Sequence, residues 1–439
     1  MRLQHQWGSV LVAAVLGGLV GVTTVAAAGA QFLPVLSIRE GANRSLMIPR
    51  ADGYIAYLTL LNVRDGGING VPLVWEECET VWDVTRTVEC YERLKGKGPT
   101  GAAVFHPMGT PPTYALVERA THDRIPLITL GYGRADAADG RVFPYVFNPP
   151  SNYWSQNTAK IHFIGQRSGG MEKLKGLKIA HIYPDDAYGQ ETIPLLDMQA
   201  ARYGFAVQHL PVPRPGLDQK ATWLRVKVAQ PDWIILRAAG VMTWTALKEA
   251  AQIGFPRDKI VGSSPACTEQ DMVPAGEAAR GYICPSLFGT GRNFPLIQEV
   301  LTYVYARGQG PGPESDVGTV YWIRGIMHGV LTAEALRTAM REFGNQPLTG
   351  AQVQWGLDHL NITAASIKEL GAEGLMRPIT LSCRDHEGGG SVKFQQWDGT
   401  QWTVISDWIA PDQALVRPLV EASAAKYAQD KGITPRNCP

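Results

Sequence analysis

Apolar positions in the first half of the chain alternate between the spacing of a helix and that of a buried strand. Tyr54, Leu58 and Leu61 recur at helical intervals and precede Gly66 and Gly67, which predicts an amphipathic helix that ends where a glycine takes positive φ. The same reasoning predicts further helices at residues 84–94 and 113–122, and strands at residues 71–75, 102–105 and 125–130. Strands and helices therefore alternate from about residue 52 onward.

The alternation repeats in the middle of the chain. Strands are predicted at residues 178–183, 206–210, 233–236 and 259–262, and helices at residues 188–203, 220–229 and 243–253. Short apolar strands that each lead into a helix are typical of parallel sheets with helices on both faces. Because crossovers are right-handed, such sheets leave a crevice at the carboxyl ends of their strands, where ligands bind. We therefore predict an α/β protein built on doubly wound parallel sheets.

In the last third of the chain the regular alternation of strands and helices stops. This part predicts helices at residues 294–306, 317–343, 349–360 and 415–429, with a glycine- and proline-rich connection at 308–313. Two alternating segments, 391–397 and 402–405, flank the dipeptide Asp398-Gly399, which is a tight-turn signal and predicts a hairpin.

Composition and charge exclude several classes of protein. The chain has 439 residues, of which 45% are hydrophobic and 18% charged, so it is globular and long enough for two or three folding units. Lys and Arg number 41 and Asp and Glu number 40, a net charge of +1. This balance supplies no basic field, so we expect no binding to nucleic acid or to lipid surfaces.

The N-terminus has the pattern of an export signal. Arg2 and His5 precede an apolar run that ends in small residues, as in a signal peptide covering residues 1–30 with cleavage after Ala28 or Ala30. An uncleaved membrane anchor is the alternative, but the run is short and rich in Gly and Ala. We expect the mature chain in the periplasm.

Cysteine usage agrees with export. The six cysteines are Cys78, Cys90, Cys267, Cys284, Cys383 and Cys438. An even number outside the cytosol predicts disulfides, and six cysteines allow 15 pairings. We prefer pairing of nearest neighbours, 78 with 90, 267 with 284 and 383 with 438, because each pair then lies inside one local unit. The spacing typical of zinc ligands does not occur, so we expect no metal and no cofactor.

Several short segments share their order and spacing with a known family. They are residues 66–73 (GGINGVPL), 75–78 (WEEC), 125–129 (IPLIT), 183–189 (YPDDAYG), 247–250 (LKEA) and Gly281-Tyr282. In these the chain resembles the type I periplasmic binding proteins, specifically the branched-chain amino-acid-binding family of ABC importers. The resemblance covers nearly the whole mature chain.

The resemblance implies two lobes joined by three hinge crossings. Lobe one would comprise residues 31–150 with 286–370, and lobe two residues 151–285 with 371–439. A small-molecule solute would bind between the lobes and be enclosed by a hinge motion. Permease subunits of an ABC importer at the inner membrane would recognise the closed, loaded form. We expect a monomer.

The resemblance also implies which loops contact the solute. The matching positions are Met108, Gly109, Thr110, Gly131, Tyr132, Gly133, Tyr153, Trp154, Tyr188, Ala239, Gly240 and Ser264. Thr110 keeps a hydroxyl where family members hold a ligand carboxylate, and it precedes a helix whose first N–H groups favour an anion. A role of Thr110 as an N-cap is the structural alternative and is compatible with binding.

The departures from the family pattern bear on the ligand. Amino-acid binders of the family hold the α-ammonium with an acidic residue in lobe two, and our alignment places Ser264 there. A buried ammonium without a carboxylate partner is unfavourable. We therefore expect a small or aromatic carboxylate, or a neutral compound, rather than a zwitterionic amino acid. A branched-chain amino-acid binder and a ligand-binding sensor module remain alternatives.

A secreted hydrolase is the enzymatic alternative. Residues 262–266 (GSSPA) fall one residue short of a nucleophile elbow with Ser264 at its centre. Asp385 and His386 are adjacent, so their side chains would diverge along a strand and could not complete a triad. We therefore expect a binding protein and not an enzyme.

Overall fold

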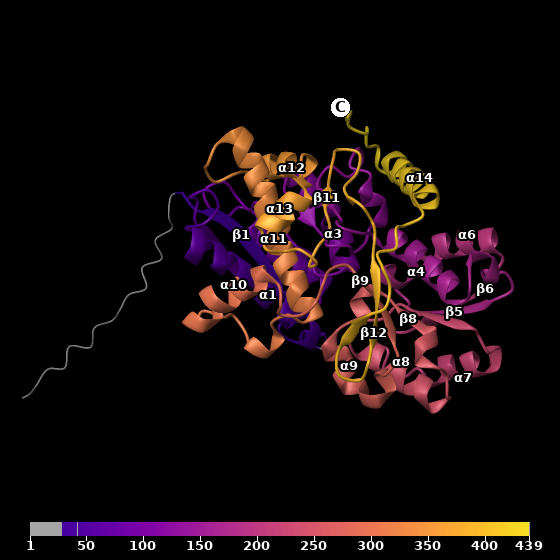
Figure 1. The fold of residues 1–439 in the computed structure, drawn as a ribbon. Coiled ribbons are helices and arrows are strands. Elements are labelled where there is room, and N and C mark those ends of the chain that lie inside the picture. Colours follow the sequence, from indigo (N-terminus) through magenta and orange to yellow (C-terminus); the bar gives the residue numbers. More distant parts are fainter. Residues whose placement is uncertain (1–28, 42, 439) are drawn as a thin grey trace, which may run out of the picture.

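The computed structural model describes residues 29–41 and 43–438. The fold is α/β with two lobes (Figure 1), as predicted. The predicted signal peptide, apart from Gly29 and Ala30, lies outside the described residues. Within the described part of the chain, no helix combines the length and the apolar character needed to cross a bilayer. The residue boundaries of the lobes stay a prediction.

The N-terminal lobe is built from short parallel strand pairs. Its strands are β1 (Gln31–Ser37), β2 (Leu73–Glu79), β3 (Leu127–Ile128) and β4 (Val146–Phe147). β1 pairs in parallel with β2, and β3 with β4. The helices on this side are α1 (Arg44–Asp65), α2 (Val84–Leu94), α3 (Thr110–Asp123), α10 (Pro295–Tyr303), α11 (Val320–Phe343), α12 (Gly350–Asp358) and α13 (Ala364–Glu369).

The packing of α1 along α11 depends on glycines. A Cβ at Gly53 would overlap the carbonyl oxygen of Trp322, and a Cβ at Gly325 would overlap that of Arg50. The two helix backbones therefore approach more closely than larger residues would permit. This contact joins residues near the N-terminus to the late helices, as Figure 1 shows by colour.

The second lobe contains a seven-stranded sheet with the order β13-β12-β9-β8-β7-β5-β6. Its strands are β5 (Lys178–Pro184), β6 (Ala206–Val212), β7 (Trp233–Leu236), β8 (Ile260–Gly262), β9 (Ile283–Ser286), β12 (Lys393–Trp397) and β13 (Trp402–Val404). Strands β5 to β9 pair in parallel, and the β12–β13 hairpin adds to β9 in antiparallel fashion. The predicted hairpin is therefore confirmed.

Helices cover this sheet. They are α4 (Tyr153–Arg167), α5 (Ala187–Gln190), α6 (Ile193–Tyr203), α7 (Lys220–Ala229), α8 (Val241–Gln252), α9 (Glu269–Ala275) and α14 (Gln413–Lys431). Of these helices α14 is the exception, because it packs chiefly on the 3-10 turn Ala135–Ala138 and also on α4 and α6, rather than on the sheet. A small antiparallel pair, β10 (Asn361–Ile362) with β11 (Ile379–Thr380), completes the described strands.

The three disulfides join the predicted pairs. Cys78 is bonded to Cys90, Cys267 to Cys284, and Cys383 to Cys438. The first two pairs are 12 and 17 residues apart in sequence, and the third is 55 residues apart. The last bond attaches the end of the chain to the segment before the hairpin.

Three local predictions were wrong. Residues 102–105 form no strand, and only Phe105 makes an isolated bridge, to Leu127. β1 was not predicted. It follows the apolar export signal, and all of its residues are buried, so its sequence lacks the alternation of apolar and polar residues that marks a half-exposed strand. The helix predicted at 188–203 divides into α5 and α6, since Pro194 lacks an N–H and begins a new helix at its first turn.

Candidate functional site

A small cavity of about 10 Å³ lies where loops of the two predicted lobes meet. Its lining residues are Trp82, Gly109, Thr110, Pro111, Tyr132, Tyr153, Tyr188, Arg214, Ala239 and Pro265. Most of them follow a strand or begin the next helix, which is where parallel α/β sheets place ligands. Six of them are residues that the sequence nominated: Gly109, Thr110, Tyr132, Tyr153, Tyr188 and Ala239.

Three tyrosines form the aromatic wall of this cavity. The ring centroids of Tyr132 and Tyr153 are 6.4 Å apart, and those of Tyr153 and Tyr188 are 5.4 Å apart. All three side chains are buried. The hydroxyl of Tyr188 is fixed by hydrogen bonds to the carbonyl oxygen of Ala238 (3.1 Å) and to Oγ of Ser263 (2.6 Å). We call these three rings the tyrosine row.

Thr110 does not have the N-cap role that was the structural alternative to ligand binding. The N-cap of α3 is Gly109, which has φ of 120°, so the N-cap interpretation of Thr110 is wrong. The Thr110 hydroxyl instead accepts a hydrogen bond from the backbone N–H of Gly133 (3.3 Å). This bond connects the first two predicted ligand loops.

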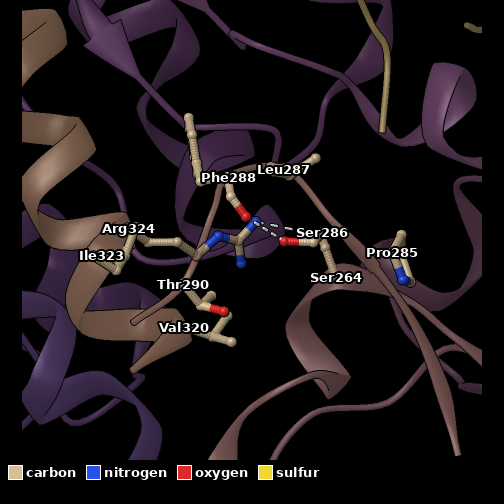
Figure 2. Close-up of a pocket in the computed structure, with 9 residues that line it drawn as sticks. All are labelled: Ser264, Pro285, Ser286, Leu287, Phe288, Thr290, Val320, Ile323 and Arg324. Atoms are coloured by element: carbon tan, nitrogen blue, oxygen red, sulfur yellow. Dashed lines mark hydrogen bonds between the residues drawn. The ribbon is translucent and has the colours of Figure 1, made fainter. Parts of the chain in front are cut away.

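A second small cavity, also of about 10 Å³, adjoins the first at Ser264 and Pro265. Figure 2 shows the guanidinium of Arg324 among Ser264, Ser286 and Thr290. Arg324 is 3% exposed, and its Nη2 donates to Oγ of Ser264 at 3.3 Å. Its Nη1 has no hydrogen-bond partner among the described residues. Ser264, another nominated residue, therefore lies beside a buried cation.

Two more buried arginines flank the tyrosine row. The Cζ atom of Arg237 lies 4.2 Å from the ring centroids of both Tyr153 and Tyr188, and its Nε donates to the backbone oxygen of Tyr188 (2.9 Å). The Cζ atom of Arg50 lies 5.3 Å from the ring centroid of Tyr132, and that of Arg324 lies 5.4 Å from it. The row therefore has guanidinium groups at both ends.

These three arginines lack the partners that buried charges normally have. Within residues 29–41 and 43–438, no ion pair includes Arg50, Arg237 or Arg324, although their residues are 1%, 0% and 3% exposed. Burying an unpaired ion is unfavourable by several kcal/mol. An anion that enters the cleft would supply the missing countercharge.

The electrostatic field at Tyr132 is accordingly positive. Burial opposes ionisation of this phenol, but the positive charges of Arg50 and Arg324 outweigh burial and lower the pKa of Tyr132 below its ordinary value. The pKa of Arg50 is lowered too, first by burial and further by the charge of Arg324. The direction of the shift at Tyr132 indicates that the two guanidiniums favour negative charge at this place.

Two partly buried carboxylates form hydrogen bonds between the predicted lobes, beside the cavities. Oε1 of Glu191 accepts from the backbone N–H of Ala135 (2.7 Å), and Oε2 of Glu269 accepts from that of Val320 (3.1 Å). Burial is the main cause that raises the pKa of each carboxyl to about 7. We call Glu191 and Glu269 the latch carboxylates.

Comparison with known proteins identifies the family. The chain matches the family model described as periplasmic binding protein over residues 31–401. The chain belongs to this family. It is 45% identical to a protein from the Pseudomonas fluorescens group whose crystal structure is described as that of an ABC transporter permease, with a TM-score of 0.89 over 94% of this chain and 100% of that one. A search of curated proteins returned no match.

More distant structures share the fold of this periplasmic binding protein. A branched-chain amino acid ABC transporter protein from Thermus thermophilus with bound valine is 19% identical, with a TM-score of 0.74 over 89% of this chain and 99% of that one. A solute binding protein of an ABC transporter from R. palustris in complex with benzoate is 16% identical, with a TM-score of 0.69 over 87% and 97%.

Family membership establishes the general function. The protein is a periplasmic binding protein of an ABC transporter, it binds a small ligand, and it is not an enzyme. Such proteins work with permease subunits, and the family indicates the periplasm. The structure also separates the residues of the hydrolase alternative, since Nε2 of His386 is hydrogen-bonded to Oδ1 of Asp358 (3.0 Å) and not to Ser264.

The remaining nominated residues lie around the cavities rather than on their walls. Met108 contacts the guanidinium of Arg50, and the carbonyl oxygen of Gly131 accepts from Nε2 of Gln156 (3.3 Å). Gly133 packs against the carboxylate of Glu191. Their ligand-binding roles stay predictions.

Two nominated residues have clear structural partners. Trp154 donates from Nε1 to the backbone oxygen of Glu191 (2.8 Å) and packs with Val416 and Val420. Gly240 begins α8, and its N–H donates to Oδ2 of Asp271 (3.2 Å). Both lie close to the site but outside the lining of the two cavities, and their ligand roles likewise stay predictions.

The buried arginines were missed from sequence, although they left a signal. Arg237 follows directly after the apolar run 233–236, and Arg324 interrupts the apolar run 320–327. A charged residue inside an apolar run is unusual, because charged side chains are rarely buried without a partner. Such a position is worth treating as a candidate for binding.

Proposed function

We propose that this periplasmic binding protein delivers a small organic carboxylate to its permease. The carboxylate would lie against Arg324 and Ser264, and the apolar part of the solute would pack on the tyrosine row. The observation that supports this most directly is the guanidinium of Arg324, which is buried, lines a cavity and has a free Nη1 within the described structure. A carboxylate accepts charge-assisted hydrogen bonds from such a group.

Of the candidate solutes, a carboxylate is the one whose net charge would balance the unpaired guanidiniums. A neutral compound would leave the positive charges of the cleft unbalanced. A zwitterionic amino acid would bring an ammonium group into a region that already holds three unpaired guanidiniums. The benzoate complex of the R. palustris protein shows that a protein of this fold can hold an aromatic carboxylate, whereas the bound valine of the Thermus thermophilus protein represents the amino-acid alternative.

Titration calorimetry of the mature protein tests the proposal. The panel consists of benzoate and hexanoate as carboxylates, benzamide as a neutral analogue, and leucine as a zwitterion. We expect the carboxylates to bind and the other two to bind at least tenfold more weakly. Arg324→Gln should weaken carboxylate binding about tenfold to a hundredfold, the worth of a charge-assisted hydrogen bond.

Arg225→Gln is the matched control, because Arg225 is exposed on α7; it should leave every affinity unchanged. Tighter binding of leucine than of the carboxylates would show that the proposed ligand class is wrong. Equal affinities of the wild type and of Arg324→Gln for benzoate would show that the proposed carboxylate position is wrong.

The structure also favours one of the two export cleavage points. Ala30 is buried, and Gln31 makes hydrogen bonds to the backbone of Leu348 with both side-chain polar atoms. Cleavage after Ala30 would place a charged α-amino group at the buried start of β1. We therefore propose cleavage after Ala28, and the intact mass of the exported protein should correspond to a chain that begins at Gly29.

A further inference from the structure

The tyrosine row lies between two groups of buried arginines, which we call its two cationic poles; Arg324 lines a cavity, and Arg237 lies behind the row. At one end, Arg324 and Arg50 lie 5.4 and 5.3 Å from the ring centroid of Tyr132. At the other end, Arg237 lies 4.2 Å from the ring centroids of Tyr153 and Tyr188. Nη1 of Arg237 is buried and has no hydrogen-bond partner in the described structure, like Nη1 of Arg324.

The acidic groups around the cleft do not neutralise both poles. Glu269 and Asp271 accept hydrogen bonds from the backbone N–H groups of Val320 and Gly240. The charge of Arg237 lowers the pKa of Glu191, although burial raises it more. Glu191 is hydrogen-bonded to the backbone of Ala135 and forms no ion pair among the described residues.

Lys160 supplies no countercharge to Arg237. It is buried in α4, and burial, followed by the charge of Arg237, holds the pKa of its ammonium well below the ordinary value. One carboxylate at Arg324 would therefore leave the Arg237 pole without a countercharge.

From this arrangement we infer that the solute is a dicarboxylate, with one carboxylate at Arg324 and the second at Arg237. The inference rests on the proposed function and extends it from one anionic group to two. The steps of 6.4 and 5.4 Å along the tyrosine row suit carboxylates separated by a benzene ring or a short methylene chain. The flat tyrosine rings provide the apolar contact for that spacer.

Matched pairs of acids test this inference in the wild-type protein. Calorimetry compares benzoate with terephthalate and isophthalate, and hexanoate with adipate. We expect at least one dicarboxylate to bind about tenfold or more tightly than its monocarboxylate partner, because a second buried charge-assisted contact forms. This comparison needs no variant, so it holds even where a substitution disturbs folding.

Variants of the two poles identify which arginine serves which carboxylate. Arg237→Gln should weaken binding of the dicarboxylate more than binding of the monocarboxylate, and so remove the preference for the dicarboxylate. Arg324→Gln should weaken both acids. Arg237→Lys keeps a charge at the pole and should retain part of the preference, whereas Arg225→Gln should change nothing. Circular dichroism of each variant confirms that it is folded.

The possible failures are distinguishable. If each monocarboxylate binds as tightly as its dicarboxylate, the inference of a second carboxylate is wrong and the proposed function stands. An unchanged preference in folded Arg237→Gln would likewise overturn the assignment of the second pole. If no acid of either kind binds, the proposed function itself is wrong.

Discussion

The latch carboxylates predict that solute affinity depends on pH. Glu191 and Glu269 lie in the predicted second lobe and accept hydrogen bonds from the backbone N–H groups of Ala135 and Val320, which lie in the predicted first lobe. Separation of the lobes would expose both carboxyls to water and return each pKa to its ordinary value of 4.5, whereas in this structure, where both hydrogen bonds are formed, burial raises each pKa to about 7. Closing therefore takes up protons at neutral pH.

The direction and size of the effect follow from these two values. The proton-linked gain in closure is complete below pH of about 4.5 and is lost as pH rises through about 7. Lowering the pH from 8 to 6 should then favour closure by about 1.4 kcal/mol for each carboxyl, or about tenfold in affinity. Both carboxyls together give about a hundredfold.

Calorimetry at pH 6, 7 and 8 measures this dependence directly. Titrations in buffers of different ionisation enthalpy also count the protons taken up on binding. Glu191→Gln and Glu269→Gln should each remove their own tenfold share, because an amide does not titrate, while Glu369→Gln on the exposed face of α13 should remove none. A constant affinity from pH 6 to 8, or an affinity that rises with pH, would refute the reasoning.

Two further predictions concern stability. Replacing Cys383 and Cys438 by serine opens a loop of 55 residues and should lower the free energy of unfolding by about 2–4 kcal/mol; an unchanged urea midpoint would contradict this. Gly325→Ala should destabilise the protein by about 1–3 kcal/mol, since its Cβ would overlap the backbone of Arg50. Gly96→Ala, where a Cβ meets nothing within 4 Å, is the control in thermal unfolding.

Sequence patterns predicted most of the second lobe and part of the site. The strands β5 and β7 are short apolar runs followed by helices, and this pattern reflects burial on both faces of a parallel sheet. The same topology places the loops after successive strands at one edge. Tyr132 and Tyr188 were nominated from the family resemblance, and this topology explains why both line one cavity.

Tertiary structure alone decided the charge of the site. Arg50 and Arg324 lie on α1 and α11, 274 positions apart in the sequence (324 minus 50), yet both face the ring of Tyr132. A periodic pattern shows that a position is buried, but it does not show which groups from distant elements meet there. Whether a buried cation is paired depends on that meeting, so the unpaired arginines behind the proposed ligand class could be recognised only in the folded chain.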